Sequence, residues 1–177
     1  MPNWIYTPNH DNSARTLLGT EGERPLVCIG INPSTATPSA LDRTVATVER
    51  VAMRGGFDSF MMLNVYPQRA TDPNDLHANP DRDLHAWNLQ SIADFVDGRS
   101  LSVWAAWGTL IRKRKFLPEL LTEVATLQEL ANVRWLSRGR CSKAGDPHHP
   151  LYVKADAPLD EFDVRTHLAS LVGRAIA

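Results

Sequence analysis

The sequence contains little cysteine, no long apolar run and no recognisable export signal. Its two cysteines are Cys28, inside an apolar stretch, and Cys141, in a basic one, and neither has a neighbour spaced for metal binding. Neither a zinc site nor an iron–sulfur cluster is indicated, and we expect no cofactor. No stretch approaches the roughly 20 apolar residues of a membrane helix, and residues 1–4 do not resemble a signal peptide. We therefore expect a cytoplasmic protein without membrane contact.

A surplus of positive charge is also missing. The chain has 19 Lys and Arg against 20 Asp and Glu, which gives a formal net charge of -1. Proteins that bind nucleic acid through phosphate normally carry excess Lys and Arg, so any contact with DNA must come from a local basic patch. The sequence has no G-x-S-x-G nucleophile elbow, no Walker loop and no G-x-G-x-x-G motif. These absences argue against the commonest serine hydrolase and nucleotide-loop architectures.

What is present is an alternation of apolar runs and helical spacings, which predicts a single α/β domain over residues 1–177. Strands are expected at residues 26–31, 60–64, 101–107 and 133–136. Helices are expected at residues 40–54, 84–96, 117–127 and 160–176. Residues 4–6 suit a short edge strand, but the pattern from there to residue 25 is too weak to assign. The alternation predicts a three-layer α/β/α sandwich with a four-stranded, mainly parallel sheet.

Polar or aromatic side chains stand at the ends of the predicted strands, where ligands bind in such sheets. Asn32 follows the first strand in Gly30-Ile31-Asn32-Pro33, Asn64 ends the second, and Trp107 ends the third. An amide carries donors and an acceptor and can hold a water molecule or a base edge. Taken alone, each asparagine is better explained as a turn residue, and Trp107 is better explained as part of the core.

A loop with two histidines follows the fourth predicted strand. In residues 146–152, His148 and His149 stand between two prolines, which restrict the backbone. An imidazole held in one place can donate a hydrogen bond to a developing anion, although solvated surface histidines are an equal alternative. A metal site is disfavoured because adjacent residues rarely converge on one ion, and no third ligand is suitably spaced.

Two dense basic runs occupy residues 112–115 and 138–143. Either could contact phosphate, although such runs are usually solvated surfaces. The second run leads directly into the histidine loop. We therefore take Arg138, Arg140 and Lys143 as candidate phosphate ligands.

The order of these motifs resembles that of the uracil-DNA glycosylase superfamily over roughly residues 26–152. The motifs that carry the resemblance are Gly30-Ile31-Asn32-Pro33, Leu63-Asn64, residues 104–108 and His149-Pro150. The resemblance implies a uracil-DNA glycosylase-like fold in which Asn32 positions the attacking water. It also implies that Asn64 reads a base and that His149 stabilises the departing base.

A narrower resemblance is to the bacterial family called domain of unknown function 1643. The segments that carry it are residues 32–36, 42–45, 69–73, 106–108 and 147–152. It adds Arg69, Thr71 and Asp72 on a long polar loop, next to Asp42 and Arg43, as pocket candidates. Salt-bridging or helix capping explains these five equally well. The remaining candidates for substrate binding are Ser34, Thr35, His148 and Tyr152, beside Asn64 and Trp107.

The leading hypothesis is a nucleobase-recognising enzyme of glycosylase type that acts on DNA or on a nucleotide. An amide cannot accept a proton, so hydrolysis at Asn32 alone should be slow. Asp42 or Asp72 would have to serve as the base. One alternative is a pocket that binds a nucleotide or small metabolite without cleaving it, and the near-neutral charge favours this. Another is a hydrolase or transferase of modified nucleotides.

Overall fold

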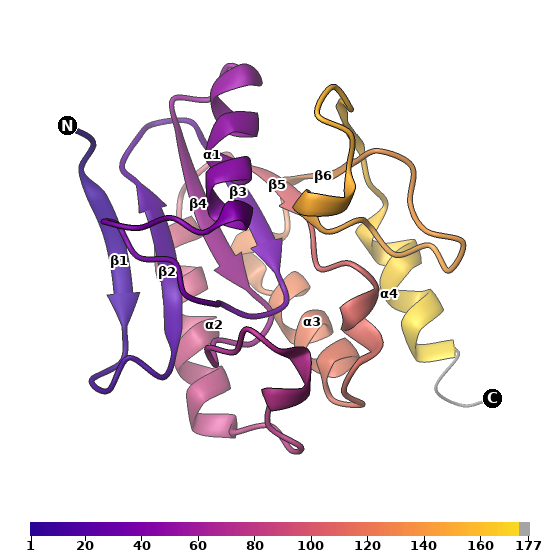
Figure 1. Cartoon of the computed structure of the whole chain (residues 1–177). Coiled ribbons are helices and arrows are strands. Elements are labelled where there is room, and N and C mark those ends of the chain that lie inside the picture. The colour runs from indigo at the N-terminus through magenta and orange to yellow at the C-terminus, as the bar shows by residue number, and fades with distance from the viewer. Residues whose placement is uncertain (174–177) are drawn as a thin grey trace.

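The computed structural model describes residues 1–173, which form an α/β fold around one seven-stranded sheet (Figure 1). Across the sheet the strands follow the order β1-β2-β4-β3-β5-β6-β7. Their bounds are β1 (Trp4–Pro8), β2 (Arg15–Thr20), β3 (Pro25–Gly30), β4 (Ser59–Asn64), β5 (Ser102–Ala105), β6 (Arg134–Arg138) and β7 (Leu159–Glu161).

The four predicted strands form, but the predicted sheet of four strands was wrong. Strands β4, β3, β5 and β6 pair in parallel, whereas β1, β2 and β7 add antiparallel pairings at the two edges. The sheet is therefore mixed. The edge strand suggested at residues 4–6 is confirmed as β1, which is half-buried along its whole length. Strand β7 gives a weak sequence signal because it has only three residues.

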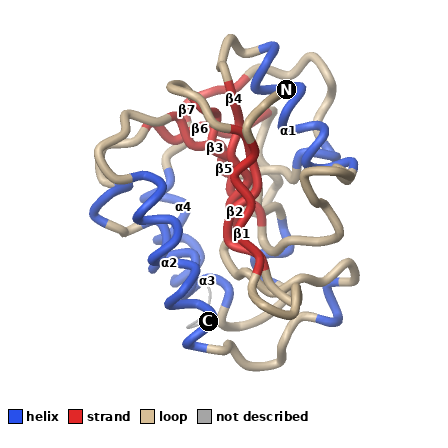
Figure 2. The backbone as a smooth tube through the Cα atoms, turned by 90° about the vertical axis from the view of Figure 1, so that its left-hand side faces the viewer, coloured by secondary structure: helices blue, strands red, loops and turns tan. Residues whose placement is uncertain are grey.

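The helices cover both faces of the sheet, as a three-layer arrangement requires. They are α1 (Arg43–Arg54), α2 (Arg82–Val96), α3 (Leu117–Ala125) and α4 (Val164–Gly173). Figure 2 shows α1 on one face and α2, α3 and α4 on the other. None of these helices in residues 1–173 has the length and apolar character to cross a bilayer.

All four predicted helices form, each with a boundary two to four residues from the expected one. Helix α1 begins at Arg43 rather than at residue 40, and Asp42 caps it: its Oδ1 atom accepts a hydrogen bond from the Val45 N–H at 2.9 Å. The helix expected over residues 160–176 begins at Val164 because β7 occupies the residues before it. The expected end of that helix, at Ile176, lies outside the described residues.

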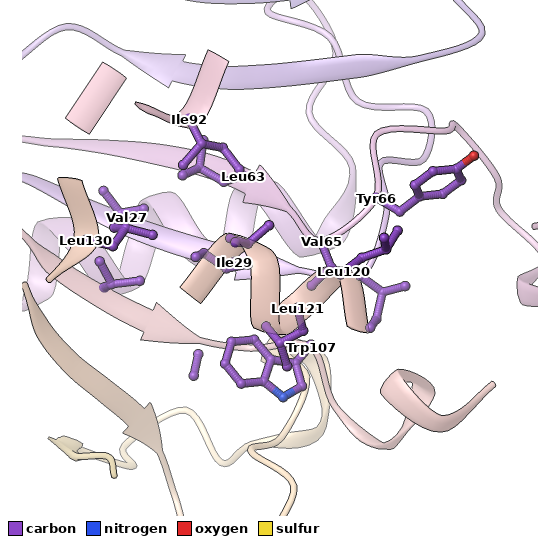
Figure 3. Packing of buried hydrophobic residues seen from close by; sticks show 14 of the residues in the cluster. Val27, Ile29, Leu63, Val65, Tyr66, Ile92, Trp107, Leu120, Leu121 and Leu130 are labelled. Carbon is purple, nitrogen blue, oxygen red and sulfur yellow. The ribbon is translucent and has the colours of Figure 1, made fainter. Parts of the chain in front are cut away.

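Two apolar clusters hold the layers together. The larger lies between the sheet and α2, α3 and α4, and its packing around Ile29, Leu63 and Trp107 is seen in Figure 3. The smaller lies under α1 and includes Cys28 and Trp104. Every residue of β3 and β4 is buried, which explains why these strands appear in the sequence as continuous apolar runs.

The connections place a topological switch point at the end of β3. The chain leaves β3 through α1 to reach β4 on one side, then passes through α2 to β5 on the other side of β3. Ligands of open α/β sheets bind where the connections diverge in this way. The segments after β3 and β5 flank that point, so they carry the candidate site.

Candidate functional site

His149 lies against the segment that follows β5. A Cβ atom built on Gly108 would lie 3.4 Å from both the N and Cβ atoms of His149. Gly108 has φ 64° and ψ -170°, a backbone conformation that is almost exclusive to glycine. The Trp107-Gly108 motif therefore lets the histidine loop pack closely against the switch point.

The tautomer of His149 follows from its contacts. Its Nδ1 atom accepts a hydrogen bond from the Leu151 N–H at 3.3 Å and caps the short 3₁₀ helix Pro150–Tyr152. The proton of the neutral ring therefore sits on Nε2. Burial lowers the pKa of His149 below 6.5, and the Asp42 carboxylate opposes this shift. At neutral pH the side chain is an uncharged donor through Nε2–H.

Asp42 connects this histidine to Arg15 through its charge. One of its oxygens caps α1, and its charge acts on the pKa of both His149 and Arg15. The residues that come together at the amino end of α1 are therefore a carboxylate, a neutral imidazole and a guanidinium. A carboxylate can accept a proton and an imidazole N–H can donate one, which is the minimum for acid–base chemistry.

The Asn32 side chain is fixed by backbone carbonyls. Its Nδ2 group donates to Ala70 O at 2.8 Å and to Pro33 O at 3.0 Å. This joins the loop after β3 to the long loop after β4. With both amide hydrogens engaged, the Oδ1 atom of Asn32 remains to accept a hydrogen bond from a ligand or a water molecule.

Asn64 lies beneath the Asn32 turn. It is 0% exposed, and in the amide orientation that suits its surroundings it donates to Asn32 O and Leu63 O at 3.3 Å each. In this orientation the amide nitrogen lies 3.3 Å from a Cβ built on Gly30. The side chain therefore contacts the turn rather than solvent, and Gly30 leaves the room that it needs.

The long loop forms an open hollow of about 370 Å³. The hollow is lined by Asn12, Ser34, Thr35, Arg69, Ala70 and Thr71. Ser34 Oγ and Thr71 Oγ1 are hydrogen-bonded at 2.9 Å, and Arg69 donates to Ser34 O. Four candidates from the sequence, Ser34, Thr35, Arg69 and Thr71, thus meet at this hollow.

Four further candidates near this edge make structural contacts or are exposed to solvent. Asp72 is exposed and caps the 3₁₀ helix Pro73–Asp75 by accepting from the Asn74 N–H at 2.8 Å. Arg43 is exposed in the first turn of α1. His148 is half-buried, and Tyr152 is 80% exposed with its ring centroid 5.5 Å from that of His149.

Trp107 and the three basic candidates lie away from this cluster. Trp107 is fully buried and donates through Nε1 to His167 Nε2 at 3.1 Å. Arg138 is also buried, and it donates to Ala155 O at 2.7 Å and Ala157 O at 3.0 Å. These hydrogen bonds hold the segment before β7 against β6. The remaining two, Arg140 and Lys143, are exposed on the loop after β6.

Sequence reasoning missed Arg15 and Tyr6, which belong to the amino-terminal hairpin. Arg69 Nη2 donates to the Tyr6 hydroxyl at 2.7 Å, and Arg15 Nη1 donates to Ala36 O at 2.8 Å. The one available signal was an arginine inside the otherwise apolar or uncharged segment 15–20. Within residues 1–173, no group of three His, Cys, Asp or Glu is arranged to hold a metal ion.

Comparisons with known proteins agree with the narrower of the two sequence resemblances. The profile of a family described as protein of unknown function (DUF1643) matches residues 15–151. No curated protein matched the chain, and no solved structure did. The matched segment begins at Arg15, ends two residues after His149 and contains Asn32 and Asp42. Because the match covers well over half of the sequence, the chain belongs to the DUF1643 family.

Proposed function

We propose that the switch-point site binds a nucleobase-containing ligand and hydrolyses its N-glycosidic bond. The observation that carries the proposal is His149, a neutral imidazole whose Nε2–H is left free because Nδ1 is engaged by the Leu151 N–H. A departing base gains negative charge as its bond to the sugar breaks. A preorganised neutral N–H group stabilises that charge by donating a hydrogen bond, with no change in its own protonation state.

Asn32 and Asp42 supply the other half of the reaction in this proposal. The free Oδ1 of Asn32 orients a water molecule, and Asp42 accepts its proton as the water oxygen bonds to the sugar carbon. The electron pair of the broken bond leaves with the base, which His149 stabilises. Asp42 is the preferred base because the amide of Asn32 is bound to Ala70 O and has no basic site.

The wider fold relationship belongs to this proposal. A uracil-DNA glycosylase-like arrangement is supported by the order of the motifs, which follow β3, β4 and β5 and then the β6 loop in turn. The second candidate function is binding of a nucleotide without cleavage. The near-neutral net charge of -1 favours this candidate over an enzyme that works on long DNA.

Measuring the release of free base distinguishes glycosidic hydrolysis from nucleotide binding without cleavage. The purified protein is incubated with nucleosides, nucleotides and uracil-containing or mismatched DNA, and free base is measured by chromatography. We expect release by the wild type and a loss of about 100-fold or more for Asn32→Ala and for His149→Gln. Asn132→Ala, an exposed asparagine before β6, is the matched control and should be unchanged. Nucleotide binding with no release from any substrate would reject hydrolysis and leave the second candidate.

A further inference from the structure

An irregularity in the amino-terminal hairpin directs an arginine toward α1. Thr7 pairs with Leu17 and Pro8 pairs with Arg15, so Thr16 is an extra residue in β2. Such a β-bulge reverses the alternation of side chains beyond it. Arg15 therefore points to the same face as Tyr6, Leu18 and the α1 cluster instead of the opposite face.

Two guanidinium groups meet at one carbonyl on that face. Arg15 is only 1% exposed, and its Nη1 donates to Ala36 O at 2.8 Å. Arg69 Nη1 lies 3.4 Å from the same oxygen and also donates to Ser34 O. Two like charges thus lie close together, with Arg15 fully buried and Arg69 half-buried, which is unfavourable unless another charge compensates them.

The positive charge of Arg15 and Arg69 is only partly compensated by the described residues of the protein. In the described chain, residues 1–173, the ion pairs formed by arginines are those of Arg82, Arg112 and Arg134, and neither Arg15 nor Arg69 pairs with a carboxylate. The Nε atoms of both are buried without a hydrogen-bond partner among these residues. Burial and the neighbouring Arg69 lower the pKa of Arg15 to about 10, and Asp42 only partly opposes them.

Hydroxyl groups surround the accessible side of this pair. Arg69 lines the hollow of about 370 Å³ together with Ser34, Thr35 and Thr71. Serine and threonine hydroxyls with a planar guanidinium are the groups that commonly bind phosphate oxygens. The hollow thus combines an excess of positive charge with suitable donors at a position that solvent can reach.

We propose that this hollow binds a phosphate group, with Arg69 and one hydroxyl of the hydrogen-bonded Ser34–Thr71 pair donating to its oxygens and Arg15 supplying a second positive charge from behind. Arg15 is a positioning residue because it holds Ala36 O and does not line the hollow. The inference deepens the proposed function and rests on it for the rest of the ligand. It specifies that the ligand is a nucleotide or a nucleic-acid strand rather than a free nucleoside.

The test measures binding separately from catalysis. The affinities of the wild type for inorganic phosphate, a nucleoside, its 5′-monophosphate and a short single-stranded oligonucleotide are determined by calorimetry at constant ionic strength. We expect phosphate to bind and the monophosphate to bind at least tenfold more tightly than the nucleoside. A monophosphate that binds better than the oligonucleotide identifies a free nucleotide as the source, and the reverse order identifies a strand.

Variants locate the site. Arg69→Gln and Thr71→Val should each weaken phosphate binding, the first by tenfold or more, whereas Arg24→Gln, an exposed arginine before β3, should not change it. If Arg69→Gln fails to fold, the monophosphate-to-nucleoside ratio of the wild type still decides the matter. Equal affinity for those two ligands, with no binding of phosphate, would overturn the inference. Phosphate binding without any base release would uphold the subsite and reject the hydrolase.

Discussion

The ion pair between Arg112 and Asp146 should respond very differently to loss of one partner or the other. Arg112 Nε and Nη2 donate to the two carboxylate oxygens of Asp146 at 3.0 and 2.8 Å. The Asp146 side chain is 0% exposed, whereas that of Arg112 is 31% exposed. The pair anchors the loop that leads to His149 to the segment after β5.

The loss of unfolding free energy in each variant depends on which charge is left without a partner. Arg112→Met leaves a fully buried carboxylate, and breaking a buried pair in this way costs about 3–5 kcal/mol. Asp146→Asn leaves a guanidinium that water can reach, so the loss is closer to that of charged hydrogen bonds, about 1.5–3 kcal/mol. For a chain of this size each kcal/mol lowers Tm by about 2–4 °C. Arg112→Met should therefore lower Tm by about 6–20 °C.

Urea unfolding followed by fluorescence of the five tryptophans measures both variants. The double variant Arg112→Met/Asp146→Asn should recover part of the loss, because it removes the unpaired charge. Two results would refute the reasoning: Asp146→Asn costing as much as Arg112→Met, or a double variant whose loss is the simple sum of the two. Either would mean that burial of the carboxylate does not control the energy.

Two further predictions concern histidines and the close glycine. Burial lowers the pKa of His85, His149 and His167 below 6.5, so the unfolded chain binds protons first as pH falls, and stability should decrease from pH 8 to pH 5. Urea midpoints that do not fall over this range would contradict this. Gly108→Ala should cost about 1–3 kcal/mol because φ 64° with ψ -170° is strained for a residue with a Cβ, which would also contact His149 at 3.4 Å. Thermal unfolding and the NMR signal of His149 measure it, and an unshifted signal would count against the contact.

The central strands were predictable because burial on both faces leaves a clear mark. Each of β3 and β4 is buried along its whole length, and such strands appear as continuous apolar runs that polar residues terminate. The amino-terminal hairpin leaves no such mark. The Thr16 bulge interrupts the alternation of β2, so period-two patterning could not identify that strand, whereas the short edge strand suggested at residues 4–6 is confirmed as part of β1.

The site was predictable where it depends on strand ends and not where it depends on distant contacts. Asn32 comes near the switch point because it follows β3 closely, Asp42 because it caps α1, and His149 because its loop packs against Gly108 after β5. Arg138 was taken as a phosphate ligand because it lies in a basic run, yet its guanidinium binds carbonyls of residues 155 and 157. A charge run does not reveal which of its members hold the fold together.

Because of the switch point at β3, the candidate site is built from segments that lie far apart in the sequence. Arg15, Asn32 and Asp42 precede β4, Arg69 follows it, and His149 comes after β6, with β3 between neighbours from both halves of the chain. No contiguous fragment much shorter than residues 15–149 contains all of these groups. The cluster therefore forms only when the whole sheet has folded. A ligand that binds these groups would stabilise the folded state of both halves of the chain together.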